Sequence, residues 1–164
     1  MIEILEMRDS EIDDLLKRVN YGHLGCSQDD VPYVVPIFFA YDKPVIYVYT
    51  TVGLKSKIID QNPKVCLQLE EFAQTGGWKS VVIMGEAEKI VDRVEREKAV
   101  DAIRRSNPTL LPALAIKWSN DWMRKNVEVV YKIKIREVTG RFTAEVKIAS
   151  AAARPNYSKP PQII

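Results

Sequence analysis

The segment 49–57 holds the densest set of groups that could bind an anion. Thr50 and Thr51 end a run of β-forming residues and are followed closely by a glycine. Lys55 and Lys57 lie in the next segment, which has helical character. Hydroxyl groups, the free N–H groups of a helix start and ammonium groups are the donors that hold a phosphate. These four side chains therefore predict a phosphate site; the alternative is a solvated helix start with scattered lysines.

Two further segments carry groups that could meet a planar ring. Trp78 and Ser80 open a strand directly after a glycine turn, which would place an aromatic ring and a hydroxyl at a rim. Pro36 interrupts an apolar strand and has no N–H to donate, so the backbone at Pro36 and Ile37 could face a ligand. The alternative for each of these residues is an ordinary place in the core.

The sequence lacks the motifs of several common catalytic sites. It has no GxGxxG or GxxxxGK[ST] phosphate loop and no GxSxG nucleophile turn. The single histidine, His23, has no serine or cysteine in a nucleophile context near it, and we interpret it as a structural or surface residue. Cys26 and Cys66 form no CxxC pair and are expected to be core or strand-surface thiols. These absences disfavour a hydrolase or a metalloenzyme, and we expect no metal site.

The composition is typical of a single globular domain over residues 1–164. The chain has 164 residues, of which 46% are hydrophobic and 28% charged, and its formal net charge is +2. A chain of this length buries enough surface to fold without disulfides or metals. No apolar run reaches the roughly 20 residues of a membrane span, and the acidic N-terminus is unlike a secretory signal. We therefore expect a cytoplasmic protein with no membrane or nucleic-acid partner.

The elements that must position these residues are mostly strands. A helix is expected within residues 1–20, with Ser10 as its N-cap and one buried apolar stripe. Strands are expected at 21–27, 31–41, 45–51, 64–72, 78–91, 127–138 and 142–148, helices at 53–62 and 92–106, and an irregular tail at 149–164. Gly85 is expected to mark a bulge or a close approach. About six antiparallel strands with few helices predict a mainly β fold, a closed or partly closed barrel.

Seven segments form a wider pattern over residues 20–142. In chain order they are GHLG (22–25), PYVVPIFFAY (32–41), IYVYTT (46–51), GLKSK (53–57), NPKV (62–65), WKSVVIMGEA (78–87) and VYKIKIREVTG (130–140). In order and spacing they resemble the flavin-binding split-barrel proteins related to pyridoxamine 5′-phosphate oxidase. The resemblance is greatest to the branch that includes the 5-nitroimidazole resistance proteins.

The resemblance implies an FMN cofactor bound at the interface of a homodimer. By position, the FMN phosphate would be bound by Thr50, Thr51, Lys55 and Lys57. The isoalloxazine ring would lie against the strand at Pro36 and Ile37, with Trp78 and Ser80 nearby. Which subunit supplies each contact is left open by the sequence.

Two departures from the family pattern bear on activity. Tyr49 stands where the nitroimidazole branch commonly has a histidine, and 149–164 lacks the arginine and tryptophan pattern of true pyridoxamine phosphate oxidases. We expect an FMN-dependent oxidoreductase that reduces a small molecule with electrons from NAD(P)H, with Tyr33 and Tyr49 as proton-transfer candidates by location. The alternatives are a flavin carrier, a haem-binding protein with the same barrel, and a deazaflavin-dependent reductase. Trp118 and Trp122, spaced i, i+4, are expected at the dimer interface or over the core.

Overall fold

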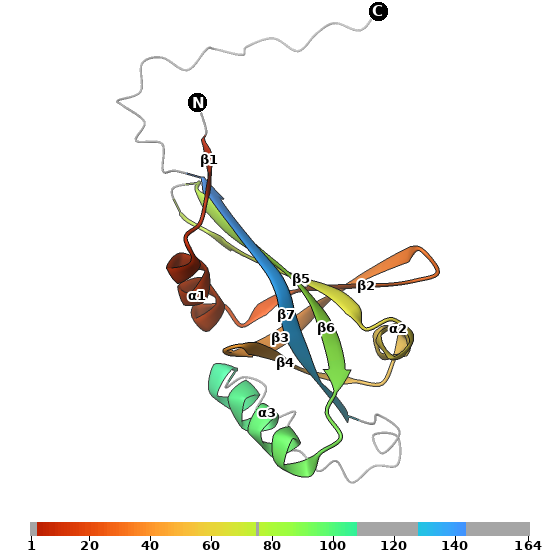
Figure 1. Ribbon diagram of the computed structural model, residues 1–164. Coiled ribbons are helices and arrows are strands. Elements are labelled where there is room, and N and C mark those ends of the chain that lie inside the picture. The colour runs from red at the N-terminus through yellow and green to blue at the C-terminus, as the bar shows by residue number, and fades with distance from the viewer. Residues whose placement is uncertain (1–2, 75, 108–127, 144–164) are drawn as a thin grey trace, which may run out of the picture.

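The computed structural model describes residues 3–74, 76–107 and 128–143. In chain order its elements are β1 (Ile4–Glu6), α1 (Asp9–Arg18), β2 (Tyr21–Gln28), β3 (Val31–Asp42), β4 (Val45–Thr51), α2 (Leu54–Gln61), β5 (Lys64–Phe72), β6 (Trp78–Lys89), α3 (Arg93–Ser106) and β7 (Glu128–Thr143) (Figure 1). The expected tail at 149–164 and the two tryptophans Trp118 and Trp122 lie outside the described residues.

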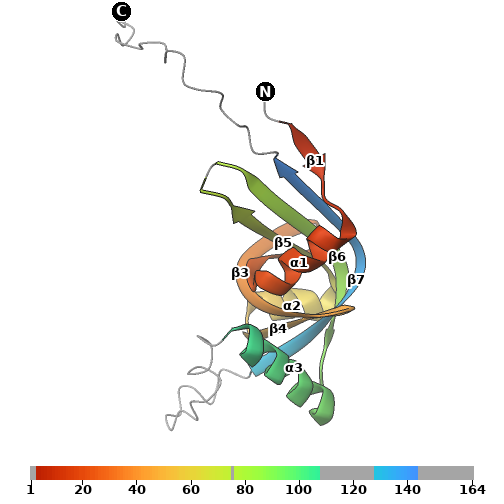
Figure 2. The same ribbon diagram turned by 90° about the vertical axis from the view of Figure 1, so that its left-hand side faces the viewer.

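Six strands form a closed antiparallel barrel. The order in the sheet is β1-β7-β4-β3-β2-β5-β6, and β6 also pairs with β7, which closes the ring. β1, a strand that the sequence did not predict, pairs with the last residues of β7. The mainly β barrel of about six antiparallel strands that the sequence predicts is therefore confirmed. The β5–β6 turn, the end of β7 and β1 project together at the end of the barrel away from α3 (Figures 1 and 2).

The prediction of two final strands separated by a turn at Thr139-Gly140-Arg141 is wrong. β7 runs without interruption from Glu128 to Thr143, and Gly140 pairs with Val81 of β6. A Cβ atom at Gly140 would lie 2.7 Å from a side-chain carbon of Ile12 on α1. The glycine is therefore needed for the close packing of α1 against the strand rather than for a turn.

The helix expected within residues 1–20 is present, but the prediction that Ser10 caps it is wrong. α1 begins at Asp9, which leaves Ser10 inside its first turn. The backbone N–H of Arg8 donates to Glu11 Oε2 at 2.8 Å. The acidic side chain three residues on thus satisfies the N–H at the N-cap position, and this interaction places the start of the helix at Arg8.

Side-chain alternation along the strands builds the barrel interior. Leu24, Phe39 and Leu67 point inward and are almost completely buried, and α1 adds Leu15 and Leu16 to the same cluster. The expected irregularity at Gly85 is confirmed, because the β6–β7 register shifts between Met84 and Gly85. A Cβ atom there would lie 2.6 Å from the carbonyl oxygen of Lys134, so Gly85 also marks a close approach of two backbones.

A second apolar cluster lies outside the barrel, where α3 covers β4 and β7. It joins Ala99 and Ile103 of the helix to Tyr47 and Val130 of the strands. The side chain of Asp92 accepts a hydrogen bond from the N–H of Glu95 and caps the helix.

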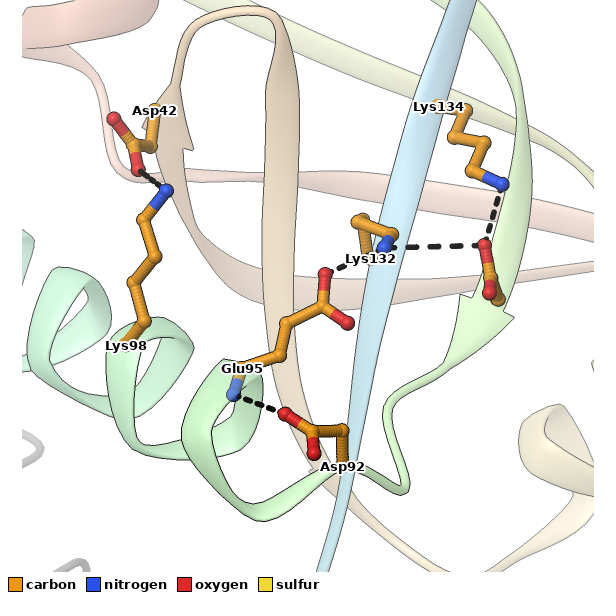
Figure 3. Close-up of polar contacts among 7 residues, drawn as sticks. Asp42, Asp92, Glu95, Lys98, Lys132 and Lys134 are labelled. Carbon is orange, nitrogen blue, oxygen red and sulfur yellow. Dashed lines mark hydrogen bonds and ion pairs between the residues drawn. The ribbon is translucent and has the colours of Figure 1, made fainter.

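Ion pairs hold the edge of α3 to the sheet. Lys98 Nζ lies 3.2 Å from Asp42 Oδ2, and Lys132 Nζ contacts Glu95 Oε1 (Figure 3). Glu88 forms ion pairs with two lysines of the neighbouring strand, with Lys134 at 2.6 Å and with Lys132 at 3.9 Å. These contacts help to fix α3 on the outer face of the sheet, where it also covers Ala40 near the end of β3.

Candidate functional site

The end of β4 and the start of α2 form a corner at the N-terminal end of the helix. Gly53 N donates to Ser56 Oγ at 2.8 Å, and this hydroxyl donates to Gly53 O at 2.9 Å. These two bonds fix the turn between the elements. The first turn of α2 contains no acidic side chain, so the positive end of the helix dipole has no local counter-charge. The corner predicted to bind a phosphate is thus formed by the fold.

The two lysines of α2 occupy different environments. Lys57 is exposed, whereas Lys55 is half-buried and near enough to Cys26 to interact with its thiol electrostatically. Burial lowers the pKa of Lys55 and raises that of Cys26. Neither lysine makes an ion pair with a residue in the described part of the chain. Lys55 is therefore not a fully solvated side chain, and its partly desolvated ammonium group would gain from a bound anion.

The two threonines face opposite sides of β4. Thr50 is 8% exposed and lies on the side of Ile46 and Val48, toward the barrel interior. Thr51, the last residue of the strand, is exposed beside the turn. Because neighbouring strand residues point to opposite faces, only the hydroxyl of Thr51 opens on the corner from the outside.

An aromatic hollow of about 260 Å³ lies on the outer face next to this corner. Its lining residues are Tyr21, Pro36, Ile37, Phe38 and Tyr49. The recorded β3–β4 pairing ends at Phe39 and Val48, before it reaches Pro36 and Thr51. The side chain of Ile37 is buried in the barrel, so Ile37 can meet a ligand only through its backbone.

Of the two tyrosines considered for proton transfer, only Tyr49 reaches the hollow. Tyr33 packs against the barrel core and faces inward. Burial and the neighbouring Glu128 carboxylate raise the pKa of the Tyr49 phenol well above its usual range. Arg96 binds that carboxylate at 3.1 Å and partly neutralises it. Tyr49 therefore presents a protonated hydroxyl at neutral pH.

A polar row continues from Pro36 across the outer face. Pro36 of β3 stands opposite His23 of β2, which stands opposite Gln68 of β5. Gln68 Oε1 lies 3.2 Å from His23 Nδ1, and Gln68 Nε2 donates to Ser80 Oγ of β6 at 3.3 Å. Two of the predicted site residues, Pro36 and Ser80, are thus joined by one row of side chains on one face.

The structure does not bring Trp78 to the phosphate corner of the same chain. Thr51 stands opposite Glu128 at the start of β7, and Lys79, next to Trp78, stands opposite Phe142 near its end. The fourteen residue-to-residue steps from Glu128 to Phe142 correspond to about 45 Å of strand. Trp78 therefore lies far along the sheet from the corner, whereas Ser80 is linked to Pro36 by the polar row.

Among the described residues, no cluster of three or more His, Cys, Asp or Glu side chains is placed to hold a metal ion. Of the helices that the structure describes, none combines the length and apolar character needed to cross a bilayer. The side chains at the corner of β4 and α2 carry ammonium and hydroxyl groups, which suit an anionic ligand rather than a cation.

Comparison with known proteins identifies the family. The split-barrel fold is shared with several solved structures, and the family described as pyridoxamine 5′-phosphate oxidase matches residues 8–142. The chain belongs to this family.

Two solved structures match most of this chain, and one further relative matches about half of it in sequence. An FAD-binding protein of Mesorhizobium loti is 28% identical with a TM-score of 0.72, and the match covers 88% of this chain and all (100%) of that one. A candidate 5-nitroimidazole antibiotic resistance protein of Bacteroides thetaiotaomicron is 21% identical with a TM-score of 0.70, covering 87% and 89%. An uncharacterized protein of Rhizobium meliloti (strain 1021) is 36% identical over 84 residues, or 51% of this chain. That match spans 56% of the relative, little more than half its length.

Sequence reasoning did not include four residues that the fold places at the site. Tyr21 and Phe38 line the hollow, and His23 and Gln68 form the polar row. Period-two alternation predicts that Tyr21 and His23 lie on one face of β2. It likewise predicts that Pro36 and Phe38 lie on one face of β3. The pairing between strands, which brings these faces together, is not present in the local pattern.

Proposed function

We propose that this protein binds FMN, with the phosphate at the corner of β4 and α2 and the isoalloxazine ring over the aromatic hollow. The observation that carries the proposal is the half-buried Lys55 ammonium group, without an ion pair among the described residues, at a helix start adjacent to that hollow. A bound phosphate would supply the missing counter-charge, and Lys57, Thr51 and the helix N–H groups would add hydrogen bonds. Thr50, whose side chain faces the barrel interior, would contact the phosphate through its backbone.

The name of the Mesorhizobium loti relative supports a flavin as the class of cofactor. That protein is named as FAD-binding, and FAD and FMN share the isoalloxazine ring and the first phosphate. The corner and hollow described here match those two shared parts. We choose FMN because the sequence resemblance to the split-barrel proteins implies it.

We further propose that the site is completed by a second copy of the chain. Trp78 lies far along β6 and β7 from the phosphate corner of its own chain, so we propose that it contacts the cofactor from a partner. The outer face of β2, β3 and β6 exposes Val34 at 62%, Met84 at 48% and Tyr21 at 43%. This apolar face fits an interface in which the ring lies between two copies.

The activity that fits such a site is reduction of a small molecule with electrons from NAD(P)H. A bound flavin supplies the redox chemistry. The residues of this chain would bind its phosphate and exclude water from the ring with Tyr21, Phe38 and Tyr49.

The test is cofactor binding by the purified full-length protein. We expect a yellow protein, or quenching of FMN fluorescence on titration, and competition experiments should rank FMN above a deazaflavin and haem. Oxidation of NAD(P)H by the FMN-loaded protein with an artificial electron acceptor would separate an oxidoreductase from a flavin carrier. Protein that remains colourless with excess FMN would overturn the proposal, and a haem absorption band lost in His23→Ala would replace it.

A further inference from the structure

His23 lies on the outer face of the barrel beside the aromatic hollow. It is two residues from Tyr21 on the same face of β2, and the two ring centroids are 5.8 Å apart. Across the sheet it stands opposite Pro36 of β3. Tyr21 and Pro36 both line the hollow. The chain's single histidine is therefore next to the hollow on two sides.

A chain of hydrogen bonds fixes the protonation of this ring. Gln68 Nε2 donates to Glu70 Oε2 at 2.9 Å, and since a carboxylate only accepts, the amide NH₂ of Gln68 must face Glu70. The amide oxygen Oε1 then faces His23 Nδ1 at 3.2 Å. An amide oxygen also only accepts, so Nδ1 must carry the hydrogen. The neutral ring consequently has its lone pair on Nε2.

The Nε2 atom is available to a ligand. It lies across the imidazole ring from Nδ1, so it faces away from Gln68 and β5. Within the described residues it makes no hydrogen bond, whereas Nδ1 is engaged. The side chain is half-buried, with the Tyr21 ring and Pro36 beside it on the face away from Gln68. The hydrogen bond between Nδ1 and Gln68 is sufficient to link β2 to β5. The Nε2 acceptor, which is free among the described residues, has no part in that link, so it is available for another role.

We propose that His23 is a cofactor-binding residue whose Nε2 atom accepts a hydrogen bond from an N–H group of the ring bound over the hollow. The inference rests on the proposed function, since the isoalloxazine ring provides that N–H group. Gln68 and Glu70 are positioning residues that act through His23. This assigns His23 a role beyond the structural or surface place expected from the sequence.

The first test needs no ligand. Because the chain has one histidine, ¹⁵N-labelled protein without an affinity tag gives a single set of imidazole signals. At alkaline pH, where an imidazole is neutral, the wild-type protein should show the hydrogen on Nδ1. In Gln68→Leu, which removes the acceptor, the signals should move toward a mixture of both tautomers. A wild-type ring with its hydrogen on Nε2, or an already mixed population, would overturn the relay.

The second test compares two amide substitutions of His23 by FMN titration. A glutamine amide reaches the position of Nε2, whereas an asparagine amide reaches only that of Nδ1. His23→Gln should bind FMN within about twofold of wild type, and His23→Asn about 3- to 10-fold more weakly, the loss of one hydrogen bond. Circular dichroism and thermal midpoints check that both variants fold, and the wild-type imidazole signals should shift when FMN is added.

The outcomes separate the two proposals. If wild-type protein binds no FMN, the proposed function fails and this inference fails with it. If wild-type protein binds FMN but His23→Asn binds it equally well, or the imidazole signals do not respond, only the role of His23 fails. If His23→Asn retains affinity and His23→Gln loses it, the ring acts through Nδ1 as a structural link, and the inference is also overturned.

Discussion

Lys55 is the residue at which stability and binding are expected to conflict. Its ammonium group is half-buried beside Cys26, and burial lowers its pKa. We predict that Lys55→Met, which keeps the aliphatic stem and removes the charge, raises the thermal midpoint of the apo protein and weakens FMN binding at least about tenfold. Differential scanning calorimetry and FMN titration measure the two effects. A lower midpoint together with unchanged affinity would show that Lys55 has only a structural role.

The phosphate assignment itself is tested by removing both lysines. Each charge-assisted hydrogen bond contributes roughly 1.5–3 kcal/mol, so Lys55→Ala with Lys57→Ala should weaken FMN binding about 100-fold or more while the fold is retained. The matched control is Lys43→Ala with Lys98→Ala, which removes the same charge near Asp42, at the other end of β4. Equal FMN affinity in the two double variants would place the phosphate elsewhere.

Asp13 gives a prediction for pH dependence. Lys17 and the Tyr41 hydroxyl, which donates at 2.9 Å, hold its pKa at about 2, below the ordinary 3.8. Since the folded-state pKa is the lower one, the stabilisation is complete above about pH 4 and is lost as the pH falls toward 2. Asp13→Asn should therefore lower the urea midpoint at neutral pH and match wild type near pH 2. Tyr41→Phe, which leaves Lys17 in place, should lower the urea midpoint at neutral pH by a smaller amount. If the urea midpoint of Asp13→Asn differs from that of wild type by the same amount at every pH, the prediction is contradicted.

At the scale of the element, two strand glycines have different roles. A Cβ atom at Gly85 would lie 2.6 Å from Lys134 O, whereas one at Gly25 would lie 3.6 Å from Cys66 O, an ordinary contact. Gly85→Ala should therefore destabilise the protein by about 1–3 kcal/mol, and Gly25→Ala should leave it unchanged or up to about 1 kcal/mol more stable. Urea denaturation checks both. Equal midpoints would mean that the β6–β7 bulge relaxes without strain.

The elements that are periodic along the chain could be predicted from the sequence, and those fixed by distant contacts could not. β5 alternates as expected, because its inner residues face one core. The sequence predicts two strands in place of β7, because glycine is common in turns and Gly140 was judged from its neighbours in the chain alone. Its neighbours in space, Ile12 and Met7, are more than a hundred positions away in the chain, and they require a glycine within a strand.

At the scale of the whole molecule, the proposed site requires two copies. Val34 is 62% exposed on the outer face of β3, and we predict that Val34→Glu dissociates the dimer, because it would bury a charge at the interface. FMN affinity should fall by about tenfold or more with it. The control is Val91→Glu at an 86% exposed position between β6 and α3. Sedimentation velocity measures the oligomeric state of each variant. A wild-type protein that sediments as a monomer when loaded with FMN would refute the two-copy site.

The sequence by itself determined the class of fold and the chemical groups of the phosphate corner. These features are local: they are alternating strands, and a glycine with two lysines within nine residues. Local features can be recognised from residues that are neighbours in the sequence. Only the tertiary structure decided which of those groups face one another. Pairing of β2 with β3 and β5 joined Pro36, His23 and Gln68 in one row, and the length of β7 separated Trp78 from Thr51. Strand register depends on the burial of one face of every strand at once, which no single segment of the chain encodes.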